Sequence, residues 1–279
     1  MPAPTHGAVV VGVGSSAEDL EVVRTAAGEA AAHDRPLHLL HAFNWAAALE
    51  SFSVSGPRAV AEDLLEQAGR VAAEAAPAVP VTDEIVEGSP VEALIRASDS
   101  AFLVAVGDGG MAGCVSCVPA DSPAVQLAAR AGCPVLVARP EPPPQGPLLV
   151  GFDGSESSRA TLGYAFDCAE HRGTRLLVIR VVEPDRHPDG DDGLLDEAVA
   201  RYGSRHPQVA VECHTVRGEP GGVLVEQSRS AQVALVGARG DEPLRGMLGA
   251  VSQTLLYHSP APVIVVRGLD PEAEDEEGP

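Results

Sequence analysis

Two stretches decide the fold, Ala8-Val-Val-Val-Gly-Val-Gly-Ser-Ser16 and Leu148-Leu-Val-Gly-Phe-Asp-Gly-Ser155. Each is a short aliphatic run that ends in a glycine-rich turn, as is typical of a buried parallel strand leading into a helix. A constant shift of 139 residues places Gly12 on Gly151 and Gly14 on Asp153. The chain therefore repeats its opening pattern in its second half.

The repetition continues in the same order along both halves. The matching segments are 37–43 with 176–182, 86–90 with 216–220, 102–107 with 232–237, and 133–139 with 261–267. So many ordered matches indicate a duplicated domain. We expect a first domain at 1–139, a stiff Pro-rich linker at 140–147, a second domain at 148–268 and a solvated acidic tail at 269–279.

Within each half, aliphatic runs of strand length alternate with helical patterns. We expect strands at 8–13, 37–43, 79–86, 102–107 and 134–138, buried on both faces, and at 148–152, 176–182, 209–216, 232–236 and 262–266. Expected helices cover 17–33, 57–76, 156–171, 191–204, 219–229 and 250–258. The predicted fold is α/β, with two tandem Rossmann-like domains, each an open parallel five-stranded sheet flanked by helices.

Composition excludes several classes of function. The 19 basic residues are all arginines, so a Walker-type phosphate loop and Schiff-base chemistry are ruled out. A net charge of −21 argues against nucleic acid as a partner. No run reaches the roughly 18 apolar residues that a membrane span needs, and no basic secretory start is present, so we expect a cytoplasmic protein that does not enter a membrane.

Glycine-rich segments flank the fourth strand of the second half. Gly237-Ala-Arg-Gly240 ends that strand, and Gly249-Ala-Val-Ser252 opens the following helix. Glycines let the backbone approach a phosphate closely, and a helix start adds partial positive charge. Because parallel sheets bind ligands beyond the carboxyl ends of their strands, this segment and Asp153 predict a phosphate site; the alternative is a turn without a ligand.

These residues resemble the universal stress protein family in its tandem form, over about 8–139 and 148–268. The family's nucleotide signature is Gly, two residues, Gly, nine residues, Gly, and then Ser or Thr. Here only eight residues separate Gly240 from Gly249, Ala250 stands at the hydroxyl position, and Ser252 supplies a hydroxyl two positions later. The resemblance implies that the second domain binds ATP, with Mg²⁺ as a candidate companion. The implied site residues are Gly151, Phe152, Asp153, Val181, Gly237, Arg239, Gly240, Gly249, Ala250, Val251 and Ser252.

The first half departs further from that signature. Gly14 replaces the acid, and Asp121-Ser122-Pro123 falls where Gly-Ser-Val is expected. We therefore expect a structural or interaction domain there. Gly12-Val-Gly-Ser-Ser-Ala17 also imitates a dinucleotide fingerprint, but no acid follows the second strand, so an oxidoreductase is disfavoured.

The resemblance implies a stress-response protein that acts through a change of conformation or of an unidentified partner. No catalytic residue is predicted, because no motif positions a general base or nucleophile. A nucleotide-free interaction scaffold and a slow ATP hydrolase remain open alternatives. In the family the last strands, here 134–138 and 262–266, commonly meet, which implies an intramolecular pseudo-dimer, with a homodimer as a further option.

The cysteines and histidines do not predict a metal site. Cys114 and Cys117 are loop cysteines that could also form a reversible disulfide, whereas Cys133, Cys168 and Cys213 are expected to be small core residues. His38 and His41 should point to opposite faces of a strand, each satisfied by its own hydrogen bond.

Overall fold

The computed structural model describes residues 5–14, 16–43, 57–109, 111, 122–184, 193–239 and 246–267. It divides into two compact units, Met1–Pro142 and Pro143–Pro279, and the division falls inside the predicted linker segment 140–147. Cys114, Cys117 and Asp121 lie outside the described residues, as does the predicted tail.

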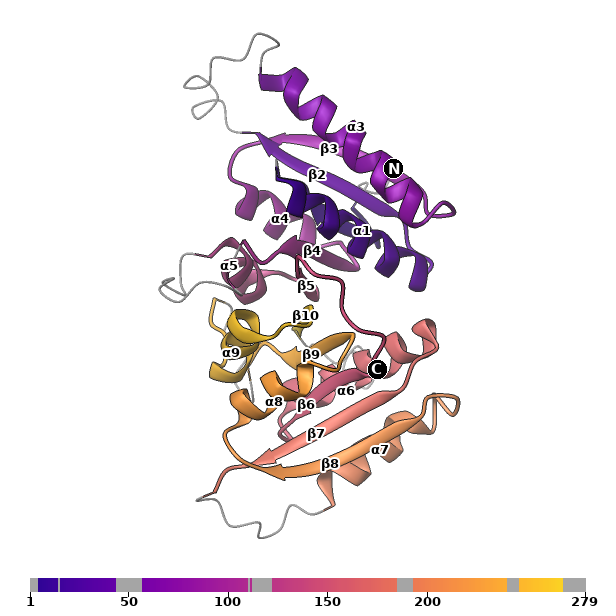
Figure 1. Cartoon of the computed structure of the whole chain (residues 1–279), viewed down its shortest axis with the longest axis vertical. Helices are drawn as coiled ribbons and strands as arrows, with labels where there is room; N and C mark the ends of the chain where they lie inside the picture. The colour runs from indigo at the N-terminus through magenta and orange to yellow at the C-terminus, as the bar shows by residue number, and fades with distance from the viewer. Residues whose placement is uncertain are drawn as a thin grey trace, which may run out of the picture. The chain divides into compact units, whose positions relative to one another are not determined.

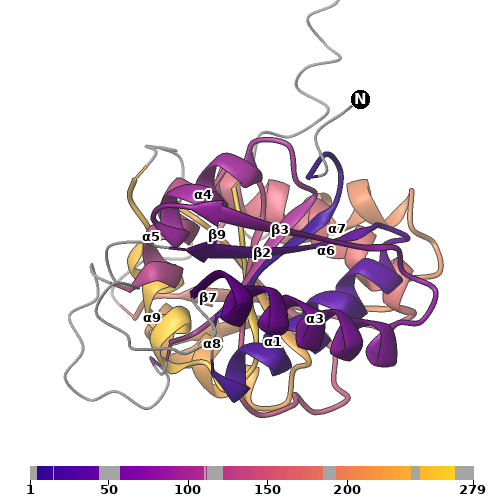
Figure 2. The same ribbon diagram turned by 90° about the horizontal axis from the view of Figure 1, so that it is seen from above.

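The first unit contains a parallel sheet in the order β3-β2-β1-β4-β5. Helices α1 and α3 pack together on one face, and α4 and α5 pack on the other (Figure 2). In chain order the elements are β1 (Val9–Gly12), α1 (Ala17–Ala32), β2 (Leu37–Phe43), α3 (Pro57–Ala75), β3 (Val81–Glu87), α4 (Pro90–Ser98), β4 (Leu103–Gly107), α5 (Pro123–Arg130) and β5 (Val135–Ala138).

The second unit repeats this arrangement, with a parallel sheet in the order β10-β9-β6-β7-β8. Helices α6 and α7 cover one face, and α8 and α9 cover the other (Figure 1). Its elements are β6 (Leu148–Phe152), α6 (Glu156–Arg172), β7 (Leu176–Val182), α7 (Leu194–Gly203), β8 (Val211–Arg217), α8 (Pro220–Ser228), β9 (Val233–Gly237), α9 (Ala250–His258) and β10 (Val263–Val266). The predicted class, two tandem parallel α/β sheets flanked by helices, is confirmed.

Local sequence explains where the helices begin and end. Ser16 caps α1 together with Asp19, and the Ser155 hydroxyl caps α6 by accepting from the N–H of Ser158. Helix α6 ends at Gly173, whose φ of 60° lies in the left-handed region that glycine adopts without strain. The first strand of each unit therefore leads directly into a capped helix, which fixes the edge where the predicted site residues lie.

The edge strands β3 and β8 are largely exposed. For β3 this differs from the prediction that the aliphatic run 79–86 is buried on both faces. Four residues of β3 are exposed, among them Asp83, Glu84 and Glu87, and five residues of β8 are exposed. The cause is topological, since among the described strands β3 pairs only with β2 and β8 pairs only with β7. Cys213 consequently lies exposed on β8, so the prediction of a core cysteine is wrong there, while Cys133 and Cys168 are buried.

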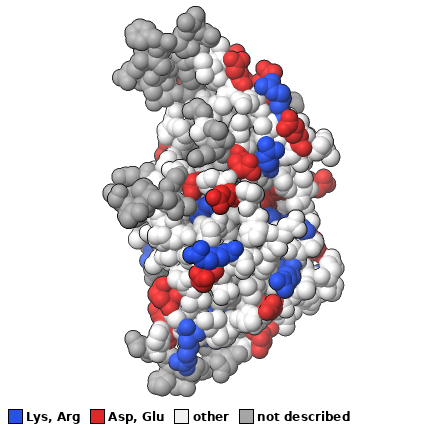
Figure 3. Space-filling model, in the orientation of Figure 1, with Lys and Arg blue, Asp and Glu red and all other residues white. Residues whose placement is uncertain are grey.

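Charged side chains of both signs are interspersed on the face shown in Figure 3, among large areas of uncharged surface. The core beneath is aliphatic: Leu37, Leu103, Leu148 and Leu235 are fully buried on central strands. Within the described ranges, no helix has both the length and the apolar character required to cross a bilayer.

Candidate functional site

The carboxyl ends of β6 and β9 lie side by side in the second unit. Val150 of β6 pairs with Leu235 of β9, and Phe152 pairs with Arg180 of β7 on the other side. The chain leaves β6 toward β7 and returns to β9 on the opposite flank, so strand order reverses here. Such a reversal is where parallel sheets bind ligands. It brings Gly151, Phe152, Asp153, Val181 and Gly237 to one edge.

Asp153 is the first residue after β6, and it is accessible to solvent although its carboxylate is partly buried. Its Oδ1 accepts hydrogen bonds from the Ser155 N–H at 3.0 Å and from the Ser155 hydroxyl at 2.5 Å. Partial burial pushes the pKa of Asp153 upward, but the hydrogen bonds from Ser155 and Ser158 outweigh it and lower the pKa below its usual value. The site therefore holds an ionised carboxylate at neutral pH, able to accept bonds from hydroxyl or amino groups.

The start of α9 lies against the end of β9. The N–H of Gly249 donates to the carbonyl of Ala238 at 2.8 Å, which fixes Gly249 as the N-cap residue. Gly249, the N-cap residue, has no side chain that could accept from the first turn of this helix. The N–H groups of Ala250, Val251 and Ser252 belong to the first turn, which has no intrahelical acceptor, and they carry the positive end of the helix dipole. Helix starts with these features bind anions in many proteins.

Ser252 is buried, and its hydroxyl donates to the carbonyl of Gly237 at 2.6 Å. That bond joins the first turn of α9 to the last residue of β9. The Ser252 hydroxyl proton is therefore used within the fold, and the group left for a ligand is the backbone N–H. Ala250, at the usual hydroxyl position, is exposed and has no polar side chain.

Two arginines reach the segment that precedes α9. Arg239 Nη1 lies 3.5 Å from Sδ of Met247, and Arg267 Nη2 lies 3.4 Å from the Met247 carbonyl oxygen. Met247 is 53% exposed and precedes Gly249 by two residues. Arg239 was predicted from the sequence; Arg267 was not, although both halves end in a matching Arg. Gly240 and Arg245 lie outside the described residues.

The glycines of the predicted site serve different purposes. A Cβ on Gly151 would lie 2.8 Å from Cδ1 of Leu224, and a Cβ on Gly237 would collide with the Ser157 hydroxyl. These two glycines are therefore required by helix packing. A Cβ on Gly249 would meet Ala238 O at 3.7 Å, an ordinary contact. Among the described residues, no packing contact requires glycine at position 249.

In the first unit, Asp19 supplies a carboxylate in place of the acid that is absent at Gly14. The Asp19 Oδ2 atom accepts from the Ser16 N–H at 2.8 Å and from the Ser16 hydroxyl at 2.6 Å. Ser155 makes the same two bonds to Asp153 in the second unit. A carboxylate thus accepts from the matching serine in both units. It follows the serine by three residues in the first unit and precedes it by two in the second. The signal available beforehand was the Ser-x-x-Asp spacing of a helix-capping box.

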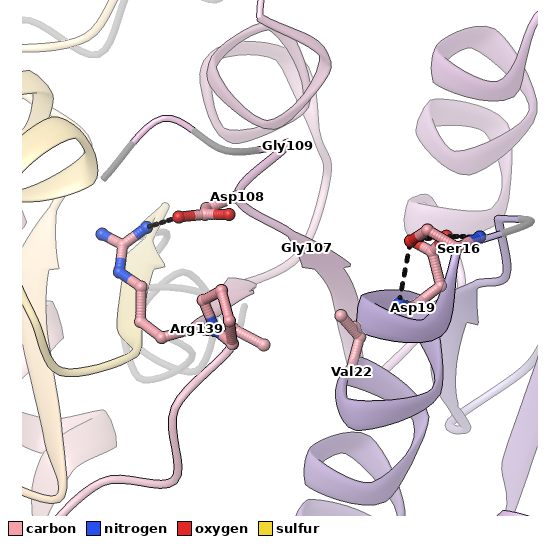
Figure 4. A pocket seen from close by; sticks show the side chains of 9 residues that line it. Ser16, Asp19, Val22, Gly107, Asp108, Gly109 and Arg139 are labelled. Carbon is pink, nitrogen blue, oxygen red and sulfur yellow. Dashed lines mark hydrogen bonds and ion pairs between the residues drawn. The ribbon is translucent and has the colours of Figure 1, made fainter. Parts of the chain in front are cut away.

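A small cavity of about 60 Å³ in the first unit lies at the corresponding sheet edge (Figure 4). It is lined by Ser16, Asp19, Val22, Gly107, Asp108, Gly109, Ala138, Arg139 and Pro140. Arg139 Nη1 and Asp108 Oδ2 are 3.3 Å apart, and both side chains are buried. Burial lowers the pKa of Arg139, while the Asp108 carboxylate opposes this shift. An ion pair between two side chains thus sits where the second unit has Ala238.

The remaining candidates have local roles. The Nδ1 atom of His38 lies 2.9 Å from Oγ1 of Thr82, and that of His41 lies 2.8 Å from the Val13 carbonyl oxygen, so the two histidines have separate partners. Burial raises the pKa of the Cys133 thiol to about 12, which leaves it unreactive. Among the residues with described side chains, no group of three or more His, Cys, Asp or Glu is arranged to hold a metal ion.

A sequence model of the Universal stress protein family matches residues 6–139 and again 146–267. A universal stress protein of Mycolicibacterium smegmatis is 33% identical to this chain, covering 94% of it and 98% of the relative. One from Mycobacterium tuberculosis is also 33% identical, covering 95% of this chain and 98% of the relative.

Two solved structures have the same fold over nearly the whole chain. A universal stress protein of Archaeoglobus fulgidus has a TM-score of 0.71 at 19% identity, covering 94% of this chain and 97% of its own. A functionally unknown protein of Pseudomonas aeruginosa has a TM-score of 0.63 at 18% identity, covering 97% and 95%.

Proposed function

The chain belongs to the universal stress protein family, and from that premise we propose that its second unit binds ATP at the edge formed by β6, β9 and α9. Nucleotide binding would govern its action as a cytoplasmic stress-response regulator, through a change of conformation or of protein partner. The observation that carries the proposal is the first turn of α9, which begins at the N-cap glycine Gly249 and is held against β9 by the bond from Gly249 to Ala238.

The residues present fit a nucleoside triphosphate. The N–H groups of residues 250–252 would hold phosphate oxygens, because backbone donors at a helix start do not depend on side-chain identity. Asp153, ionised and exposed, would accept hydrogen bonds from the nucleoside, and Val181 would supply apolar contact at the next strand end. Mg²⁺ and Arg239 would offset repulsion from a chain of net charge −21.

Ala250 sets an upper limit on affinity. A hydroxyl bonded to a charged phosphate contributes roughly 1.5–3 kcal/mol, which corresponds to about ten- to a hundredfold in affinity. Ser252 does not restore this bond readily, because its hydroxyl donates to the Gly237 carbonyl. We therefore expect weaker binding than in an otherwise equal site with Ser at 250, so that occupancy of the site would vary with the cellular ATP concentration.

The test is calorimetric titration of the full chain with ATP and Mg²⁺. Asp153→Ala should weaken binding about tenfold, because it removes a charged acceptor. Asp63→Ala, which removes an exposed carboxylate from α3 in the first unit, should leave the Kd unchanged. Absence of both binding heat and thermal stabilisation at millimolar ATP would favour the nucleotide-free scaffold.

Slow hydrolysis is the second candidate, because a bound triphosphate beside Mg²⁺ could turn over. Phosphate release is therefore measured in the same preparation. Release that exceeds the rate without protein and falls in Asp153→Ala would establish turnover. Binding without such release would assign the site to a nucleotide-dependent switch.

A further inference from the structure

A cluster of polar side chains joins the turn between α7 and β8 to the end of α6 in the second unit. The Nδ1 atom of His206 lies 2.7 Å from Oε2 of Glu170, and its Nε2 atom lies 3.4 Å from Oδ1 of Asp167. Gln208, two residues later, donates to the other carboxylate oxygen of Glu170. The imidazole ring also stacks on the buried Phe166 of α6, with 5.7 Å between the ring centroids. Only 14% of the His206 side chain is exposed, so the ring is largely enclosed by these partners.

The first unit forms the same turn without these side chains. There the N–H of Ala76 donates to the carbonyl of Ala72 at 2.9 Å, and the N–H of His206 donates to the carbonyl four residues before it in the same way, at 3.2 Å. Ala76 is buried and stands five residues before the start of β3, as His206 stands five residues before the start of β8. At the shift of 139, Gly28 and Ala31 occupy the α1 positions that match the two carboxylates of α6. The backbone of this turn therefore does not require ionisable side chains.

The two contacts of the His206 ring depend on its proton. A protonated imidazole donates from both nitrogens, whereas a neutral one donates from one nitrogen and has a lone pair on the other. If the Nδ1–H group stays on Glu170, loss of the proton leaves the Nε2 lone pair facing the Asp167 carboxylate, so the attraction across 3.4 Å becomes repulsion. The two carboxylates, three residues apart on α6, then also lose the positive charge that contacts both of them.

Asp167 is coupled to the same proton. Partial burial of its carboxylate raises the pKa of Asp167, while the positive charges of His206 and His171 oppose this shift. A carboxyl group whose pKa is raised in the folded state binds its proton more readily there, so its contribution to stability is lost as the pH rises, in the same direction as for the imidazole. The two arginines next to the ring in sequence stay charged throughout this range and add no pH dependence. The charged and titratable groups on the elements around the ring are Asp167, Glu170 and His171 of α6, and Arg201, Tyr202 and Arg205 in or next to the last turn of α7.

We propose that His206, Asp167 and Glu170 form a proton-dependent latch, which holds residues 203–209 on the end of α6 and releases them as His206 loses its proton. An imidazole changes charge between about pH 5 and 8, so the latch responds within the physiological range. Because the Asp167 side chain is 58% exposed, water screens its contact, and release is a local opening of the turn rather than unfolding of the unit. The latch lies at the opposite end of α6 from Ser155, so it does not require a bound nucleotide.

Amide hydrogen exchange of the full chain, measured by mass spectrometry peptide by peptide, tests the latch. Protection of the peptide that covers 203–210 should fall about tenfold between about pH 5.5 and about pH 8, after correction for the intrinsic pH dependence of exchange. The peptide that covers 73–80 is the internal control, because it forms the same turn with Ala76 and should show no such fall. Equal protection of 203–210 at both pH values in the wild type would overturn the proposal.

Three variants identify the groups responsible. His206→Gln keeps a side chain that can donate to Glu170 but carries no charge, so protection of 203–210 should no longer depend on pH. Asp167→Asn should remove most of the dependence, because its amide can donate to the neutral Nε2 atom and the contact then survives loss of the proton. His171→Gln is the matched control: it removes the other histidine at the end of α6 and should leave the dependence in place. A dependence that persists in His206→Gln, or that disappears in His171→Gln, would overturn the latch.

Discussion

Leu224 of α8 lies so close to Gly151 of β6 that a Cβ on the glycine would be 2.8 Å from its Cδ1 atom. Leu94 and Gly12 repeat this relationship in the first unit, at 2.9 Å. Both distances are too short for a real Cβ contact without movement of a neighbour. Gly12 in β1 and Gly151 in β6 therefore let helices α4 and α8 pack directly on these two strands.

Gly151→Ala should lower the free energy of unfolding by about 1–3 kcal/mol, because it overpacks this contact. Combining it with Leu224→Ala should cost less than the sum of the two single changes, since the shorter side chain makes room for the new methyl group. Urea unfolding followed by circular dichroism gives all four values of the cycle. Strictly additive costs would contradict the contact.

Two helix glycines should respond oppositely to the same substitution. Among the described residues, nothing lies within 4 Å of a Cβ on Gly69 in α3, so Gly69→Ala should stabilise the protein by about 0.5–1 kcal/mol through helix propensity. A Cβ on Gly163 in α6 would lie 2.8 Å from Cε1 of the buried Tyr202, so Gly163→Ala should be destabilising. Thermal unfolding of the two variants measures the sign, and stabilisation by both would show that Tyr202 yields without cost.

Asp108→Ala should destabilise the protein by about 3–5 kcal/mol, because the buried Arg139 guanidinium loses its carboxylate. Asp108→Ala combined with Arg139→Met should recover part of that loss, since the buried guanidinium is then removed together with the Asp108 carboxylate. Denaturant unfolding of the single and double variants checks this. A double variant no more stable than Asp108→Ala would show that burial of the charge is not the cause.

His38 should make stability fall in mild acid. Burial lowers its pKa below 6.5 in the folded state, against the opposing charges of Glu84 and Asp83, so the unfolded chain binds the proton more readily. This contribution to stability is present above pH 6.5 and is lost as the pH falls through the folded pKa. His38→Gln should therefore flatten the decline in unfolding free energy between pH 7 and 5. Equal slopes in wild type and His38→Gln would contradict this.

The fold was predictable from the sequence because buried strands leave aliphatic runs with clear ends. The predicted ranges 37–43, 148–152, 176–182 and 250–258 agree with β2, β6, β7 and α9. Helices α4 and α5 were not assigned, although Pro90 of α4 matches Pro220, which opens α8. Exposure of the strands at 81–87 and 211–217 was not predictable, because the order of the strands in the sheet cannot be read from the apolar pattern of one strand.

The site was predictable only in outline. Matching segments place Asp153 and residues 249–252 at strand and helix ends, but the partner of the Ser252 hydroxyl depends on three-dimensional contact with Gly237. The sequence shows that Gly14 replaces the acid, but it does not show that Asp19 binds Ser16, which corresponds to Ser155. A comparison of the two halves position by position does not detect that an acid five residues later takes the place of the missing one.

The exposed carboxylates of β3 also have a consequence for the protein at high concentration. An unpaired strand edge can serve as a template on which other chains add, one after another, into fibrils. Asp83, Glu84 and Glu87 give the edge of the first unit a row of like charges, so two copies that meet along it repel each other. These charges therefore protect the β3 edge against the edge-to-edge addition of further chains that forms fibrils.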